Sequence, residues 1–117
     1  MKFVTKRIHA YLDYPVALAL IGMPFLLGLG TSNSFAFTLS LVTGIAALLL
    51  TVLTDHHLGL IKIVSYKMHL FVDLLVGIVF IAAPFILGFK GMDMIYYLIN
   101  GGAVLFVVSM HKEQEGV

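Results

Sequence analysis

The chain has 117 residues, of which 61% are hydrophobic and only 11% are charged, and its mean hydropathy is +1.07. A soluble domain is about half apolar and about one quarter charged. A small globule leaves much of its surface in water and cannot bury this excess, whereas a lipid bilayer accommodates it. The net charge of +1 without a basic stripe excludes a nucleic-acid partner, and the lack of cysteine excludes disulfides and thiolate sites.

Four apolar runs predict four transmembrane helices, because roughly 20 apolar residues cross the hydrocarbon core as a helix. In chain order, the runs are about Tyr14–Leu29, Phe35–Thr54, Leu70–Phe89 and Met94–Met110. The first and last runs reach full length if their helices continue into polar flanks, through His9–Asp13 and through His111. The sequence therefore predicts an all-α, integral membrane four-helix bundle that forms a single domain over residues 1–117.

The connections between the runs predict how the helices follow one another. Residues 30–34 and 90–93 are short turns, which join antiparallel neighbours. Residues 55–68 form a longer linker that mixes apolar residues with lysines, a composition typical of a segment at the membrane interface.

Basic residues lie almost entirely on one side of the predicted bundle. The side with both termini and the linker carries Lys2, Lys6, Arg7, Lys62, Lys67 and Lys112. The other side carries Lys90 alone. Because positive charge accumulates on the cytoplasmic side of membrane proteins, this bias predicts that both termini and the linker are cytoplasmic.

The sequence also contains an internal repeat. Residues 9–30 align with residues 69–90 at an offset of sixty, and the second span aligns more weakly with the fourth at an offset of fifty-seven. The coinciding polar, proline and glycine positions are His9/His69, Asp13/Asp73, Pro24/Pro84, Gly28/Gly88 and Gly44/Gly101. The repeat unit is thus a whole helical hairpin, about residues 9–54 and 69–111. Because a two-span unit begins and ends on the same side, the copies are parallel and related by a pseudo-twofold axis along the membrane normal.

Prolines and glycines in the repeat predict helix geometry. A proline inside a helix removes one backbone hydrogen bond, so Pro24 and Pro84 are expected to kink their helices. Gly28 and Gly88 follow four residues later and are expected to admit a close neighbour, with Gly44 and Gly101 as the complementary surfaces. The aromatic pair at residues 96–97 is expected to lie in the interfacial belt.

The repeated segments MPFLLG (residues 23–28) and APFILG (residues 83–88), each preceded by Asp13 or Asp73, carry a family resemblance. The chain resembles the SPW repeat family of small prokaryotic membrane proteins from His9 to Met110. It departs at the first and third motif positions, where methionine or alanine replaces the family's serine and phenylalanine replaces its tryptophan. The resemblance implies a protein of the prokaryotic plasma (inner) membrane and implies no particular biochemical activity.

Histidine and aspartate form the one polar constellation of the sequence. The pairs His9/Asp13 and His69/Asp73 are each spaced i,i+4, which places both side chains on one helix face. If these faces point toward the pseudo-twofold axis, the two pairs face each other. The remaining histidines, His56, His57 and His111, fall on the same side and are candidate additional ligands.

Several interpretations of these pairs stay open. In the first, Asp13 and Asp73 are helix-start acids, with Pro15 at the first helical position, and the protein is a structural, accessory or oligomeric membrane subunit. In the second, the aspartates serve a proton or small-ion transporter or channel. In the third, the pairs bind a divalent metal or a haem. No nucleophile with a base and no cofactor fingerprint is found, so no catalytic residue is predicted and an enzyme is disfavoured. The expected partners are the lipid bilayer and either further copies of the chain or a larger membrane complex.

Overall fold

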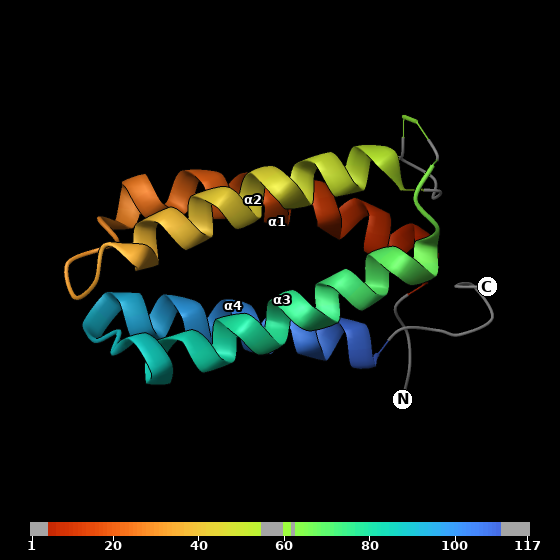
Figure 1. Ribbon diagram of the computed structural model, residues 1–117. Coiled ribbons are helices and arrows are strands. Elements are labelled where there is room, and N and C mark those ends of the chain that lie inside the picture. Colours follow the sequence, from red (N-terminus) through yellow and green to blue (C-terminus); the bar gives the residue numbers. More distant parts are fainter. Residues whose placement is uncertain (1–4, 55–59, 62, 111–117) are drawn as a thin grey trace.

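The computed structural model describes residues 5–54, 60–61 and 63–110, with the side chain of Lys6 left aside. It contains α1 (Lys6–Leu27), α2 (Phe35–Leu53), α3 (Tyr66–Leu87) and α4 (Gly91–Ser109), which Figure 1 shows side by side. At a rise of 1.5 Å per residue these helices are about 28–33 Å long, close to the roughly 30 Å of a bilayer's hydrocarbon core. All four are long and apolar enough to cross a membrane. The predicted four-helix membrane bundle is therefore confirmed.

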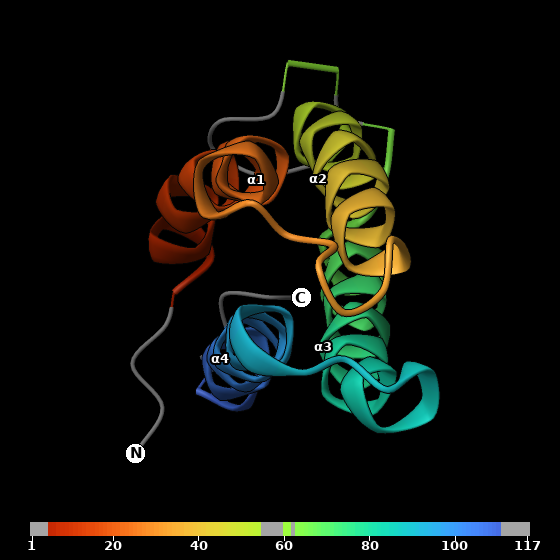
Figure 2. The ribbon, with the colours of Figure 1, turned by 90° about the vertical axis from the view of Figure 1, so that its left-hand side faces the viewer.

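The helices pair as two hairpins. Helix α1 packs along α2 and α3 packs along α4, whereas contacts between the hairpins are much sparser. Both tight turns lie at one end of the bundle, and the start of α1 and the end of α4 lie at the other (Figure 1). In the end-on view of Figure 2, α1 and α3 occupy diagonally opposite corners. The two copies are thus parallel, as the repeat predicted.

The first helix of each hairpin begins earlier than its apolar run. The side chains of Thr5 and Ser65 accept hydrogen bonds from the backbone three residues on, at 3.1 and 3.2 Å, and so cap the two helices. Helix α3 begins at Tyr66, so the last three residues assigned to the linker, 66–68, are helical. The helix starts are set by these hydroxyl caps, not by the onset of apolar residues.

This early start corrects the interpretation of the aspartates as helix-start acids. Asp13 and Asp73 are each the eighth residue of their helix, and Pro15 lies inside α1 instead of at its first position. The free backbone N–H groups of a helix belong to its first turn. Neither carboxylate caps its helix, and each lies about two turns within a spanning segment.

The repeated proline and glycine act at the other end of the same helices. Pro24 and Pro84 lie in the last turn, and Gly28 and Gly88 end the helices with φ of 62° and 70°. A methyl group on either glycine would meet nothing within 4 Å. The expected packing role of Gly28 and Gly88 is therefore corrected: they adopt the left-handed conformation that closes a helix, which glycine adopts without strain.

Close approach within each hairpin occurs at the other glycine pair. A methyl on Gly44 would lie 2.8 Å from a side-chain carbon of Ile21 and 2.9 Å from its backbone nitrogen. A methyl on Gly101 would lie 3.0 Å from the Ile81 side chain. Because Ile21 and Ile81 are repeat equivalents, both hairpins use the same glycine-on-isoleucine contact.

Pro24 also explains a polar contact inside the bundle. Proline has no N–H, so the Leu20 carbonyl lacks its usual intrahelical donor, and the Ser40 hydroxyl donates to it at 2.8 Å. The single proton of Ser40 is thereby used, so the Tyr96 hydroxyl, 2.6 Å away, donates to Ser40. Tyr96 and Tyr97 are buried, not interfacial as expected, and Tyr97 donates to the Ala36 carbonyl at 2.6 Å.

Asp93 ties the two hairpins together at the turn end. This fully buried residue of α4 accepts hydrogen bonds from the Gly30 N–H at 2.8 Å, the Ser32 N–H at 3.0 Å and the Ser32 hydroxyl at 2.6 Å. Ser32 Oγ in turn accepts from the Lys90 N–H at 3.0 Å. The turn of the first hairpin is thus bound to the turn of the second.

Removing one hydroxyl tests this connection. Ser32→Ala is expected to lower the free energy of unfolding by about 1–3 kcal/mol, because a buried carboxylate and a backbone N–H each lose a partner. The control is Ser34→Ala in the same turn, whose side chain makes no capping hydrogen bond and whose loss should change stability by less than about 0.5 kcal/mol. Thermal and denaturant unfolding in detergent micelles measures the stability of both variants. An equal loss of stability in Ser32→Ala and Ser34→Ala would contradict the role of Ser32 in joining the two turns.

Candidate functional site

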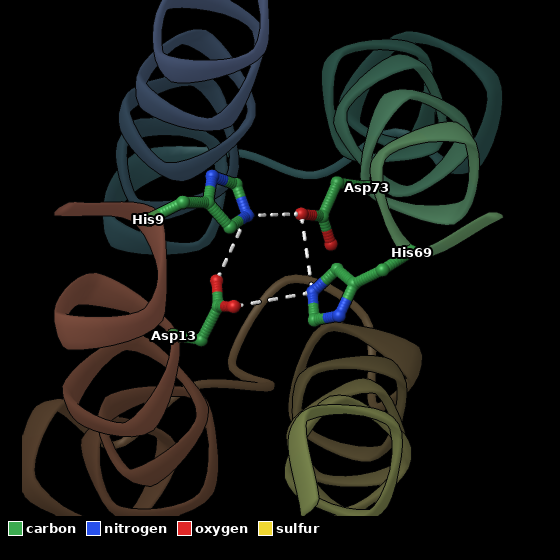
Figure 3. A group of neighbouring side chains, drawn as sticks. All are labelled: His9, Asp13, His69 and Asp73. Carbon is green, nitrogen blue, oxygen red and sulfur yellow. Dashed lines mark hydrogen bonds and ion pairs between the residues drawn. The ribbon is translucent and has the colours of Figure 1, made fainter. Parts of the chain in front are cut away.

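The two His/Asp pairs meet at the centre of the bundle. His9 and Asp13 extend from α1, and His69 and Asp73 extend toward them from α3 on the opposite corner (Figure 3). One ligand atom of each residue lies within 4.8 Å of the other three. The equivalent residues of the repeat thus face each other across the axis, as the parallel arrangement of hairpins requires.

Nitrogen and oxygen atoms alternate around this cluster. Nε2 of His9 lies 3.0 Å from Asp13 Oδ1 and 2.8 Å from Asp73 Oδ2. Nε2 of His69 lies 3.4 Å from Asp13 Oδ2 and 3.4 Å from Asp73 Oδ2. Each histidine therefore contacts the aspartate of its own helix and that of the other hairpin.

All four side chains are withdrawn from the surface. The side chains of His9 and His69 are 4% and 2% exposed, and those of Asp13 and Asp73 are 10% and 21% exposed. Ionisable groups inside a spanning segment are costly and face the bundle interior, where they satisfy one another. In the end of the bundle opposite the Asp93 tie, these contacts form a polar link between the hairpins.

Thr54 determines which nitrogen of His69 faces the cluster. The Thr54 hydroxyl donates to the Leu50 carbonyl at 2.5 Å, and His69 Nδ1 lies 2.6 Å from the same oxygen. A hydroxyl has only one proton, so Nδ1 must be the donor in its contact with Thr54. The Nε2 lone pair of a neutral His69 is consequently directed at the two carboxylates.

That orientation creates a requirement for positive charge. Lone pairs on an imidazole nitrogen and two carboxylates repel one another unless a cation lies between them. Either a second proton on His69 or a metal ion satisfies this requirement. His9 differs, because its Nε2–H donates to the carboxylates when no metal is bound, whereas a metal on Nε2 would place the ring proton on Nδ1, which is buried without a hydrogen-bond partner among the described residues.

The cluster fits a small divalent metal ion. A tetrahedral zinc site, with bonds of about 2.0–2.2 Å, holds its ligand atoms about 3.4 Å apart. The four nitrogen–oxygen contacts here, which use both oxygens of Asp13, range from 2.8 to 3.4 Å, and with one ligand atom per residue the four atoms lie within 4.8 Å of one another. Two imidazoles and two carboxylates form a ligand set for zinc and other borderline divalent ions, and the hydrogen bond from His69 Nδ1 is the outer-shell contact such ligands make.

A haem does not fit between the same histidines. The His9 and His69 ring centroids are 5.5 Å apart with the rings at 86° to each other. Two axial imidazoles bind the iron from opposite faces of the porphyrin. The flat porphyrin ring lies between them, so no other side chain can occupy that space. Asp13 and Asp73 occupy that space, at 2.8–3.4 Å from the ring nitrogens.

A cavity of about 620 Å³ adjoins the cluster. All four helices line it, and its wall is apolar apart from the His/Asp cluster and a few hydroxyl and amide side chains. It lies in the half of the bundle that holds the cluster, away from the packed aromatic side chains near the turns. The cluster therefore lies beside an internal space.

The remaining sequence-predicted ligands cannot be placed. His56, His57 and His111 lie outside the described residues. Conversely, Thr54 and Asp93 were not singled out from the sequence. Asp93 could have been found from the sequence, because it is the one acid at the predicted turn end. The contact between Thr54 and His69 has no sequence signature, because it depends on how α2 and α3 meet.

Replacing Thr54 by its isostere tests its role in orienting His69. Thr54→Val is expected to lower the free energy of unfolding by about 1–3 kcal/mol, because the His69 Nδ1–H and the Leu50 carbonyl lose a buried partner. Thr51→Val is the matched control, since the Thr51 hydroxyl contacts only its own helix, donating to Ala47 at 2.8 Å. Thermal unfolding of both variants in the same detergent measures the two losses of stability. A loss for Thr51→Val as large as that for Thr54→Val would contradict the role of Thr54 in orienting His69.

Comparison with known proteins identifies the fold as a recognised repeat. No curated protein and no solved structure matches the chain significantly. The family model of the SPW repeat domain matches residues 7–112, which include both hairpins and the whole His/Asp cluster. The chain therefore belongs to the SPW repeat domain family.

Proposed function

We propose that this membrane protein binds a divalent metal ion of the zinc type at the centre of its bundle, through His9, Asp13, His69 and Asp73. One observation carries the proposal: four ligand atoms from two hairpins converge within 4.8 Å, while Thr54 directs the His69 Nε2 lone pair into their midst. With both imidazoles neutral, the cluster has two negative charges, and a divalent ion neutralises them.

The number of protein ligands indicates the role of the ion. Four protein ligands complete a tetrahedral shell, as in structural zinc sites, whereas catalytic sites keep a position open. An ion held this way joins α1 to α3 where contacts between the hairpins are otherwise sparse. This role agrees with the structural or accessory subunit expected from the sequence, and metal binding would add to the stability of the folded bundle.

Cobalt(II) is a direct probe of the proposed site. Protein stripped with a chelator in detergent micelles should bind one equivalent of Co²⁺ and develop the visible absorption of a four-coordinate nitrogen–oxygen site. Zinc should displace cobalt, because it binds such ligands more tightly. His69→Ala should weaken binding at least about 100-fold, and Thr54→Val, which keeps all four ligands, about 10–100-fold.

His111→Ala is the matched control, since it removes one imidazole that is not among the four proposed ligands. It should leave the cobalt spectrum unchanged, and a loss of binding would show that the four residues are not the complete ligand set. Far-ultraviolet circular dichroism and gel filtration establish that each variant is folded. Stoichiometric binding that survives both His69→Ala and Thr54→Val, or no binding by the parent protein, would overturn the proposal.

A second candidate function is proton or small-ion transfer through Asp13 and Asp73. It is favoured by the position of His9 Nε2 between two carboxylates, at 2.8 and 3.0 Å, where a proton can be exchanged with either. Liposomes with the parent protein should then dissipate an imposed pH gradient faster than empty liposomes, and Asp13→Asn with Asp73→Asn should abolish the difference. Equal dissipation with and without the parent protein would eliminate this function.

The location and partners are further parts of the proposal. We place the protein in a prokaryotic plasma membrane with both termini cytoplasmic, because six of its seven basic residues lie before or in the first turn of α1, between α2 and α3 or in the first turn of α3, or after α4. Its immediate partner is the lipid that contacts the many exposed large apolar side chains of the bundle. Assembly into a homo-oligomer or a larger complex stays a prediction, and Gly44 and Gly101 do not support it, since both are used within their own hairpins.

A further inference from the structure

The cavity beside the cluster is not needed to hold a metal ion. Its volume of about 620 Å³ falls within the roughly 300–1,000 Å³ of pockets that bind drug-sized molecules. Along α1 its lining runs from His9 to Leu20, a rise of about 16 Å at 1.5 Å per residue. A compact organic molecule, far larger than an ion, therefore matches its dimensions.

The ionisable groups of the cavity wall lie at one end only, while Thr43 and Asn100 are uncharged polar residues of the wall. Asp13, Asp73 and both histidines lie at the end near the helix starts, and valine, leucine and alanine side chains line most of the rest. No lysine or arginine is among the residues that line it in the described part of the chain. A ligand complementary to this wall has an apolar body and a positive charge.

The rim of the cavity indicates the medium from which a ligand enters. Leu12 and Val16 on α1 and Val42 on α2 line the cavity and are exposed, so the cavity is open at these residues. All three lie within spanning helices, so the surface around the opening faces hydrocarbon. A ligand that enters here must itself dissolve in the bilayer.

We propose that this cavity binds a compact lipophilic organic cation, whose apolar groups fill the space between the hairpins and whose charge is balanced by Asp13 and Asp73. The cation and a metal ion neutralise the same carboxylates, so they bind in competition. Binding of the organic cation does not require the metal, so the metal proposal and the cation proposal can be refuted independently.

Tetraphenylphosphonium and tetraphenylborate test the proposal, because they share a shape and have opposite charges. Calorimetric titration of metal-free protein in detergent, corrected for protein-free micelles, should show saturable binding of tetraphenylphosphonium and at least about tenfold weaker binding of tetraphenylborate. That ratio corresponds to about 1.4 kcal/mol or more of charge discrimination. Equal affinity for the two ions, or no saturable binding of the cation, would overturn the proposal.

Two variants locate the binding site. Ala47→Phe places a ring in the cavity and should abolish tetraphenylphosphonium binding while the cobalt spectrum persists. Ala19→Phe is the matched control, since Ala19 is exposed on α1 and does not line the cavity, and it should bind like the parent. Unchanged binding by Ala47→Phe, or equal loss in both variants, would place the cation elsewhere and contradict the proposal.

Neutralising the acids tests the charge balance, and zinc tests competition. Asp13→Asn with Asp73→Asn should weaken tetraphenylphosphonium binding at least about tenfold, and unchanged affinity in a folded double variant would contradict the role of the carboxylates. Zinc should displace bound tetraphenylphosphonium from the parent protein. Cation binding without any cobalt binding would refute only the metal proposal, and cobalt binding without cation binding would refute only this one.

Discussion

Two carboxylates and two imidazoles buried in a membrane-spanning bundle must satisfy one another, and the arrangement of the helices follows from that need. Away from water each group depends on partners within the protein, because an unsatisfied polar group in hydrocarbon costs several kcal/mol. Asp13 and Asp73 find those partners across the axis, with Nε2 of His9 at 2.8 Å from Asp73 and Nε2 of His69 at 3.4 Å from Asp13. The parallel repeat is what makes this mutual satisfaction possible.

The two ends of the bundle use different devices to hold the hairpins together. At the turn end, Asp93 binds the turn of the first hairpin, and the hydroxyls of Tyr96 and Tyr97 on α4 bond to Ser40 and to the Ala36 carbonyl on α2. At the other end, the His/Asp cluster links α1 to α3, Thr54 contacts His69, and a cavity adjoins the cluster. The turn end thus carries the hydrogen-bonded tie between the hairpins, and the end with the helix starts carries the ionisable groups.

Several features show how local rules were overridden by tertiary contacts. Pro15 suggested a helix start, but the caps of Thr5 and Ser65 start both helices two turns before Asp13 and Asp73. Pro24 removed a hydrogen bond from the Leu20 carbonyl, and Ser40 of the neighbouring helix replaced it. Tyr96 and Tyr97 suggested an interfacial belt, but each found a hydrogen-bond partner inside the bundle and became buried. In each case a hydroxyl group supplied the partner that decided the outcome.

The sequence by itself determined the membrane environment, the four spans, the pairing into parallel hairpins and the four residues of the cluster, because hydropathy, repeat offsets and i,i+4 spacing are properties of the chain. It also determined that repeat equivalents on the axis would face each other. Only the tertiary structure decided that the axis passes through His9, Asp13, His69 and Asp73, that Thr54 orients His69, and that a cavity lies beside them. These depend on how each helix is rotated and on how α1, α2 and α3 pack, which involves segments distant in the chain.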